Sequence, residues 1–183
     1  MTYLPDPTDY AGLRQGDRKV FEQLFRAWFP RLAGYALRIT GNPDAAEDVV
    51  QDVFVRIWEK IENLPEAAQL PAYLFRAVRN RALNHQRQLK TSDRLAAAAL
   101  DDPVIMPEAL ARVEVPELQF AVTAALRKLS PRELEVFMLS RRDGLTYSSI
   151  AQTLGISVKT VETLMGRALK SLRSQLADLR DNR

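Results

Sequence analysis

The sequence predicts an all-α fold made of two small helical domains joined by a flexible linker, the C-terminal one a helix-turn-helix. Apolar residues recur at helical spacing over several long segments, and no segment alternates convincingly between apolar and polar residues. Hydrophobic residues make up 46% of the 183 residues, which is enough for packed cores and excludes a wholly disordered chain.

The first domain is expected to span residues 1–90. An apolar residue at every fourth position from Val20 to Leu32 predicts its first long helix. The Gly-Asn-Pro-Asp sequence at 41–44 is expected to end this helix and to start the next, with Asp44 as the N-cap. Two further helices are expected over residues 45–61 and 72–90, separated by a loop with a proline at each end.

The composition changes over residues 91–115, where Thr-Ser-Asp, an alanine run and several prolines are typical of a linker. The second domain is therefore expected over residues 116–183. Its clearest helix start is Ser130 as N-cap, with Pro131 in the first helical position and Glu133 three residues after the cap.

A helix-turn-helix is predicted after that helix. Thr146 is expected to cap a short helix that Gly155 ends in a positive-φ conformation, and Ser157 is expected to cap a longer second helix. The short helix is expected to turn Ile150, Ala151 and Leu154 inward. The expected buried stripe of the longer helix is Val158, Val161, Leu164, Ala168 and Leu172.

The composition also excludes several classes of site. The chain has no cysteine, which excludes a disulfide framework, a thiolate zinc site and a cysteine nucleophile, and a single histidine leaves no His-rich metal site. No cofactor, metal or catalytic residue is expected. The first ten residues carry Asp6, Asp9 and two prolines where a signal peptide needs a basic end and an apolar run, so we expect a cytoplasmic protein without direct membrane contact.

The net charge of +3 conceals alternating blocks of charge. Residues 1–64 and 101–130 each carry −2, residues 65–100 carry +4, and the chain from residue 131 carries +3. Two basic blocks indicate two surfaces that face polyanions, although ordinary solvated helix faces would give a similar pattern.

Residues near the start of the second helix of a helix-turn-helix reach base edges in the major groove. Arg167, Lys170 and Arg173 lie further along and suit phosphate contacts or plain solvation. The alternative interpretation is a helical hairpin with a solvated face. The exposed candidates for base contact are Ser157, Lys159, Thr160, Glu162 and Thr163.

The helix expected over residues 72–90 carries arginines interleaved with amides along one side, a pattern that suits single-stranded nucleic acid. The preceding helix has an acidic face with Asp44, Asp48, Gln51 and Asp52. Because no nucleophile or second cluster of ligands accompanies these carboxylates, a solvated or protein-docking face is favoured over a magnesium or catalytic site.

Taken in order, these segments resemble the extracytoplasmic-function (ECF) sigma factors, the smallest members of the sigma-70 family of bacterial transcription initiation factors. The resemblance rests on the helix-turn-helix and on four segments, residues 21–25, 44–54, 71–80 and 129–133. It implies a factor, not an enzyme, that directs core RNA polymerase to specific promoters and promotes DNA melting.

The resemblance also implies a role for each candidate residue. Sigma region 2, residues 1–90, would bind the β′ clamp helices through Asp48, Gln51 and Asp52, and would hold a flipped base of the −10 element in a loop at about Glu62 to Leu70. The DNA-facing residues at the −10 element would be Tyr73, Arg76, Arg79, Asn80, Asn84 and Arg87. Sigma region 4, residues 116–183, would pack on the β flap and read the −35 element with Ser157, Lys159, Thr160, Glu162, Thr163 and Arg167.

Relatives in this family are often held inactive by an anti-sigma factor, so such a factor is a further expected partner. The chain departs from the family at Glu162 and Leu164, where many relatives have basic residues, at Tyr73, often Trp, and at Asn84, often Asp. The alternative function is a stand-alone helix-turn-helix transcriptional regulator similar to response-regulator output domains, because residues 157–163 resemble their recognition helix. A metal-dependent enzyme using Asp44, Asp48 and Asp52 is the remaining alternative.

Overall fold

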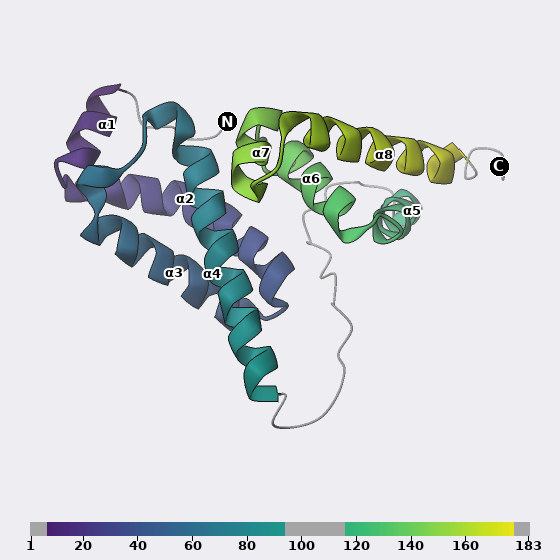
Figure 1. Cartoon of the computed structure of the whole chain (residues 1–183), viewed down its shortest axis with the longest axis horizontal. Coiled ribbons are helices and arrows are strands. Elements are labelled where there is room, and N and C mark those ends of the chain that lie inside the picture. Colours follow the sequence, from purple (N-terminus) through teal and green to yellow (C-terminus); the bar gives the residue numbers. More distant parts are fainter. Residues whose placement is uncertain (1–6, 94–115, 178–183) are drawn as a thin grey trace. The chain divides into compact units, whose positions relative to one another are not determined.

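The structure is a computed structural model that describes residues 7–93 and 116–177. The described helices fall into two compact units, α1 to α4 and α5 to α8 (Figure 1). The described residues contain no strand, which confirms the all-α prediction. The elements are α1 (Pro7–Arg14), α2 (Arg18–Thr40), α3 (Pro43–Glu59), the 3-10 turns η1 (Ile61–Asn63) and η2 (Ala67–Gln69), α4 (Leu70–Asp93), α5 (Pro116–Arg127), α6 (Pro131–Arg141), α7 (Tyr147–Leu154) and α8 (Val158–Ala177).

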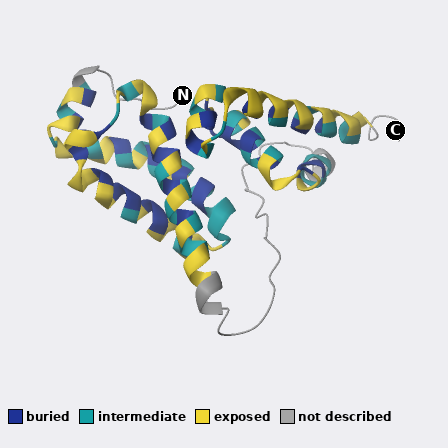
Figure 2. Ribbon diagram, in the orientation of Figure 1, coloured by how far each residue is buried: buried dark blue, intermediate teal, exposed yellow. Residues whose placement is uncertain are grey.

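The first unit is built on a core that α2, α3 and α4 share. Trp28 and Tyr35 of α2 and Phe75 of α4 are at most 1% exposed. The Phe75 ring lies 6.3 Å from that of Trp28 and 5.2 Å from that of Tyr35, both in edge-to-face arrangements. Because the helices pack against this core, each has one buried side and one exposed side (Figure 2).

Local sequence sets the ends of the helices in this unit. Gly41 ends α2 with φ 73°, as predicted. The N-cap of α3 is Asn42, whose side chain accepts a hydrogen bond from the Ala45 amide at 3.0 Å. The prediction of Asp44 as N-cap was wrong by two residues, because Pro43 occupies the first helical position and Asn42 therefore precedes the helix as its cap.

The loop between α3 and α4 is partly helical. It contains η1 and η2, and α4 begins at Leu70 rather than at 72, because Pro71 fits the first turn of a helix. Helix α4 continues to Asp93, three residues into the expected linker. The rest of that predicted linker, residues 94–115, lies outside the described residues.

The second unit packs α5, α6 and α7 against α8, and its helix caps are those predicted. Ser130 and Glu133 form the capping box, Thr146 accepts from the Ser149 amide at 3.1 Å, and Gly155 has φ 67°. Ser157 accepts from the Thr160 amide at 3.0 Å and so caps α8. The side chains that make up its hydrophobic cluster come from α5, α6, α8 and the turn between α5 and α6: Ala125, Leu126, Leu129, Leu134, Met138, Ala168 and Leu172.

Three predicted core positions in the helix-turn-helix, Leu154, Val158 and Leu164, are less buried than expected. In α7 Leu154 is only half-buried, and Thr153 is buried instead, with its hydroxyl donating to the Ser149 carbonyl at 2.8 Å. In α8 Val158 is 42% exposed, because the buried stripe starts one turn later. That stripe is Val161, Met165, Ala168 and Leu172, spaced i, i+4, i+7 and i+11, with Leu164 half-buried beside it.

Two leucines on α4 test the packing of the first unit. Leu74 is fully buried and Leu89 is 48% exposed, on the same helix. We expect Leu74→Ala to lower the free energy of unfolding by about 2–5 kcal/mol, because it removes core contacts and leaves a cavity. Leu89→Ala should change it by no more than about 0.5 kcal/mol. Urea unfolding followed by circular dichroism measures both, and equal losses would contradict the packing described.

Candidate functional site

One face of α4 gathers most of the residues expected to contact the −10 element. Tyr73, Arg76, Asn80, Asn84 and Arg87 are all exposed, at spacings of i, i+3, i+7, i+11 and i+14 that place them along one stripe of the helix. The Arg87 guanidinium donates to the Asn84 side-chain oxygen at 3.2 Å, which holds the two residues together.

The sixth candidate, Arg79, is half-buried and lies to the side of that stripe. The structure therefore brings five of the six candidates onto one exposed face. Tyr73 stands at its start, in the first turn of α4, with 38% of its surface exposed.

The acidic face of α3 carries the three residues expected to bind polymerase. Asp48 and Gln51 are exposed. Asp52 is only partly exposed, and the same carboxylate oxygen pairs with the Arg56 side chain at 3.0 Å and with that of Arg81 on α4 at 2.6 Å. Asp52 thus joins α3 to α4 within the unit, a role that the sequence did not reveal.

No group of three or more His, Cys, Asp and Glu side chains within the described ranges is placed to hold a metal ion. The same ranges hold no helix with the length and apolar character that a membrane crossing requires.

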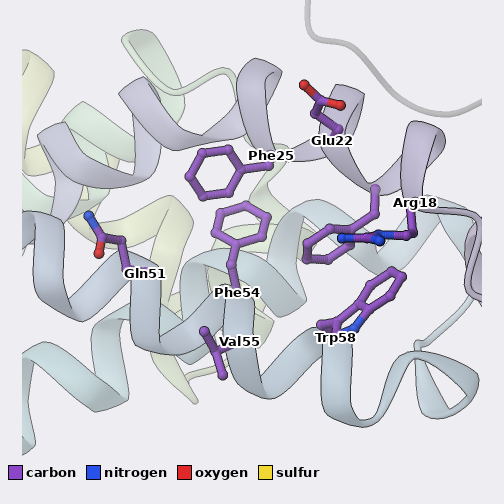
Figure 3. Close-up of a pocket in the computed structure, with 8 residues that line it drawn as sticks. Arg18, Glu22, Phe25, Gln51, Phe54, Val55 and Trp58 are labelled. Carbon is purple, nitrogen blue, oxygen red and sulfur yellow. The ribbon is translucent and has the colours of Figure 1, made fainter.

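An apolar groove lies beside this acidic face, between the first half of α2 and α3 (Figure 3). The Phe21 ring lies 4.8 Å from that of Trp58, and the Phe25 ring lies 4.9 Å from that of Phe54. The polar residues of its lining include Gln51. The groove therefore continues directly into the acidic face.

This groove was not predicted from the sequence. Aromatic residues at helical spacing are read as core, and Phe54 and Trp58 belong to such a stripe. In the structure Trp58 is 37% exposed and Val55 57% exposed. Val55 was the available signal, because an apolar residue there lies outside the buried stripe of α3.

The loop from Glu62 to Leu70, expected to hold a flipped base, is fastened to α1. Arg14 donates to the Glu62 carbonyl at 3.0 Å, and the Tyr10 hydroxyl donates to the Pro65 carbonyl. Leu64 and Leu70 are buried and anchor the loop from within. Helix α1 was not part of the site expected from the sequence, because these contacts join residues 48 and 55 positions apart.

The six residues of α8 and its cap expected at the −35 element are all exposed. Three of them use their hydroxyl groups within the helix. Ser157 and Thr160 lie 2.8 Å apart at their hydroxyl oxygens, and Thr163 donates to the Lys159 carbonyl at 2.8 Å. The long charged side chains that extend from this face belong to Lys159, Glu162 and Arg167.

Two further residues of this face were not predicted. Val158 presents an exposed apolar side chain beside Lys159. Gly166 is exposed in the middle of α8, where a glycine costs about 0.5–1 kcal/mol relative to alanine.

Tyr10 supplies a pH-dependent contribution to stability. Burial raises the pKa of Tyr10 above 10.0, and the nearby Arg14 charge opposes this. Because the folded-state pKa is the higher one, the unfolded chain loses the phenol proton first. We therefore expect the stability that Tyr10 contributes to be present below pH 10 and to be lost as the pH rises through the folded-state pKa.

The measurement is urea unfolding between pH 9 and 11, with Tyr10→Phe as the control. The wild-type chain should lose stability more steeply with pH than Tyr10→Phe. Parallel curves for the two proteins would show that Tyr10 is not held in its protonated, buried form.

Comparison with known proteins gives a consistent result for both units. Residues 24–91 match the family Sigma-70 region 2, and residues 119–172 match Sigma-70, region 4. The chain is 30% identical over 152 residues to the ECF RNA polymerase sigma factor SigL of Mycobacterium tuberculosis, covering 79% of this chain and 82% of SigL. It is also 30% identical over 174 residues to the RNA polymerase sigma factor CnrH of Cupriavidus metallidurans, covering 88% of each.

Two solved structures are similar at 26% sequence identity. One is the sigma factor RpoE in complex with the anti-sigma factor NepR from Bartonella quintana, with a TM-score of 0.68 over 87% of this chain and 98% of that chain. The other is CnrH in complex with the cytosolic domain of CnrY, with a TM-score of 0.65 over 95% of this chain and 98% of that chain.

Proposed function

The chain belongs to the ECF RNA polymerase sigma factors of the sigma-70 family, and we propose that its two helical units contact two different forms of promoter DNA. A sigma factor directs core RNA polymerase to specific promoters and promotes DNA melting. Residues 1–90 would act as region 2, residues 116–183 as region 4, and residues 91–115 as the connection. The observation that carries this proposal is that each unit presents its own exposed, DNA-compatible face, the stripe on α4 and the start of α8.

The stripe on α4 suits the melted −10 element. Bases of a single strand stack on exposed aromatic rings while arginines follow the phosphates. Tyr73 supplies the ring, Arg76 and Arg87 supply charge, and the amides of Asn80 and Asn84 supply hydrogen-bonding groups between them. The loop that α1 holds in place ends at Leu70, three residues before Tyr73, and this closeness supports a role for the loop in receiving a base displaced from the strand.

The start of α8 suits duplex DNA at the −35 element. The N-terminal residues of a recognition helix enter the major groove, where an exposed carboxylate accepts from the cytosine amino group and an apolar group contacts the thymine methyl. Glu162 and Val158 provide these two groups. Lys159 and Arg167 provide positive charge on the same helix, for base or phosphate contacts.

The groove between α2 and α3 suits the core polymerase. A sigma factor must bind core enzyme through a protein interface, and the energy of such interfaces is concentrated in a few aromatic residues. Trp58 and Val55 are exposed apolar residues in the groove, and Asp48 and Gln51 continue the surface onto the acidic face. We assign this continuous surface to the β′ clamp helices, and the second unit to the β flap.

Trp58 and Tyr73 offer a matched pair of variants, since both are aromatic residues of one unit with 37% and 38% exposure. We expect Trp58→Ala to weaken binding to core polymerase at least tenfold, because it removes an aromatic anchor. The Tyr73→Ala variant should bind core polymerase as tightly as the wild type but should no longer melt promoter DNA. Competition for core against a labelled sigma factor and permanganate reactivity of promoter thymines measure the two effects.

Melting that falls only in proportion to core binding in both variants would contradict the division between the two surfaces. Asp48→Asn adds a test of the acidic face, because Asp48 is exposed whereas Asp52 is tied to Arg81. Asp48→Asn should weaken core binding and leave the unfolding free energy unchanged.

The experiment that tests the function as a whole adds the chain to core polymerase on sheared genomic DNA and maps transcript starts, with core alone as the control. Discrete new starts that share two upstream motifs are expected. Unchanged starts, together with duplex binding by the chain alone, would favour a stand-alone regulator.

The solved relatives RpoE and CnrH are each in complex with another protein, NepR, an anti-sigma factor, and the cytosolic domain of CnrY. By likeness to them we propose that an anti-sigma factor also controls this chain, and that it works in the cytoplasm, where core polymerase acts. The chain would act by binding alone, with no catalytic residue and no metal.

A further inference from the structure

Gly166 is a residue that the packing of the protein does not explain. It lies inside α8 with an ordinary helical backbone, and a Cβ atom added there would meet no atom of the described residues within 4 Å. Neither a positive φ nor a close neighbour in its own unit therefore requires glycine at this position. Because glycine weakens a helix interior, its presence here points to a contact that the packing within the described unit does not show.

The position of Gly166 on α8 indicates the kind of contact. The buried stripe of α8 runs through Met165 and Ala168, and Gly166 lies on the opposite side. On that side Thr163 precedes it by about one turn, and Lys170 and Arg173 follow it. The flanking positive charges are complementary to phosphate.

The distance from the start of α8 to Gly166 indicates which part of the DNA would lie next to Gly166. Gly166 lies eight residues after Val158, which corresponds to about 12 Å along the helix axis. The major groove of B-DNA is about 12 Å wide. With the start of α8 in the groove, Gly166 lies where the helix passes the sugar-phosphate strand at the edge of the groove, and Lys170 and Arg173 lie just beyond.

We infer that Gly166 is a point of close approach between α8 and the phosphodiester backbone of the −35 duplex. The missing side chain lets the strand lie nearer to the helix than a methyl group would allow. This brings the phosphates within reach of Lys170 and Arg173 and seats the start of α8 deeper in the groove. The inference rests on the proposed function of the second unit in −35 recognition.

The test uses variants that strengthen the helix while filling this space. Alanine and leucine are both good helix formers, so Gly166→Ala and Gly166→Leu should raise the melting temperature of the free chain by a few degrees. Holoenzyme made with Gly166→Ala should bind the mapped promoter about tenfold more weakly, and Gly166→Leu more weakly still. Neither variant should weaken binding when the −35 element is scrambled.

Gly12→Ala is the matched control. It adds the same methyl group to a helical glycine of the other unit, where the new Cβ would lie at an ordinary contact distance of 3.7 Å from the Asp17 Cβ. Promoter affinity should not change in this variant.

Promoter affinity within twofold of wild type for both Gly166 variants would overturn the inference, and so would a lower melting temperature for Gly166→Ala. Wild-type holoenzyme that does not distinguish the intact from the scrambled −35 element would instead overturn the proposed function, and the inference with it.

Discussion

The arrangement of the first unit depends on the packing of α2, α3 and α4 against one another, in which Trp28, Tyr35 and Phe75 join α2 to α4. Because α3 and α4 each bury one side in this shared core, their other sides are exposed at fixed positions relative to each other. The exposed side of α3 carries the groove and the acidic face, and that of α4 carries the stripe that begins at Tyr73. One small core thus supports both of the surfaces proposed to bind polymerase and DNA.

The Asp52–Arg81 ion pair joins the two helices that carry these surfaces. It connects the acidic face of α3 to α4 at 2.6 Å, and Arg56 contacts the same carboxylate. A partly exposed pair of this kind contributes about 1 kcal/mol or less to stability, so its importance is positional. It fixes the direction of Asp52 and places Arg81 on the side of α4 that faces the protein, away from the stripe.

In the second unit, too, the helix ends and the core determine which side of a helix is exposed. The hydroxyl groups of Thr146 and Ser157 cap α7 and α8, and Gly155 makes the turn between them. The buried stripe of α8 then leaves the opposite side exposed over its whole length, which is what a helix needs in order to enter a groove of DNA.

The helices and most of their caps could be predicted because they depend on residues close together in the sequence. Ser130, Thr146, Gly155 and Ser157 were all assigned correctly, whereas Asn42 was missed because Pro43 at the first helical position moves the helix start two residues earlier than predicted.

Features that depend on distant residues were not predictable. The fastening of the loop by Tyr10 and Arg14 joins segments about 50 residues apart, and the periodicity of α8 alone did not show that Val158 is exposed. The groove was missed because its aromatic residues have the spacing of a core.

The central claim is that the two units contact different forms of DNA in one promoter complex. A photoreactive residue placed at Asn80 or at Lys159 of the holoenzyme tests this most directly, with crosslinks mapped to single bases in the open complex. The account predicts that position 80 crosslinks to the melted −10 strand and position 159 to the −35 duplex, both only when core polymerase is present. Crosslinks from position 80 to duplex DNA alone, or from either position equally well without core polymerase, would contradict it.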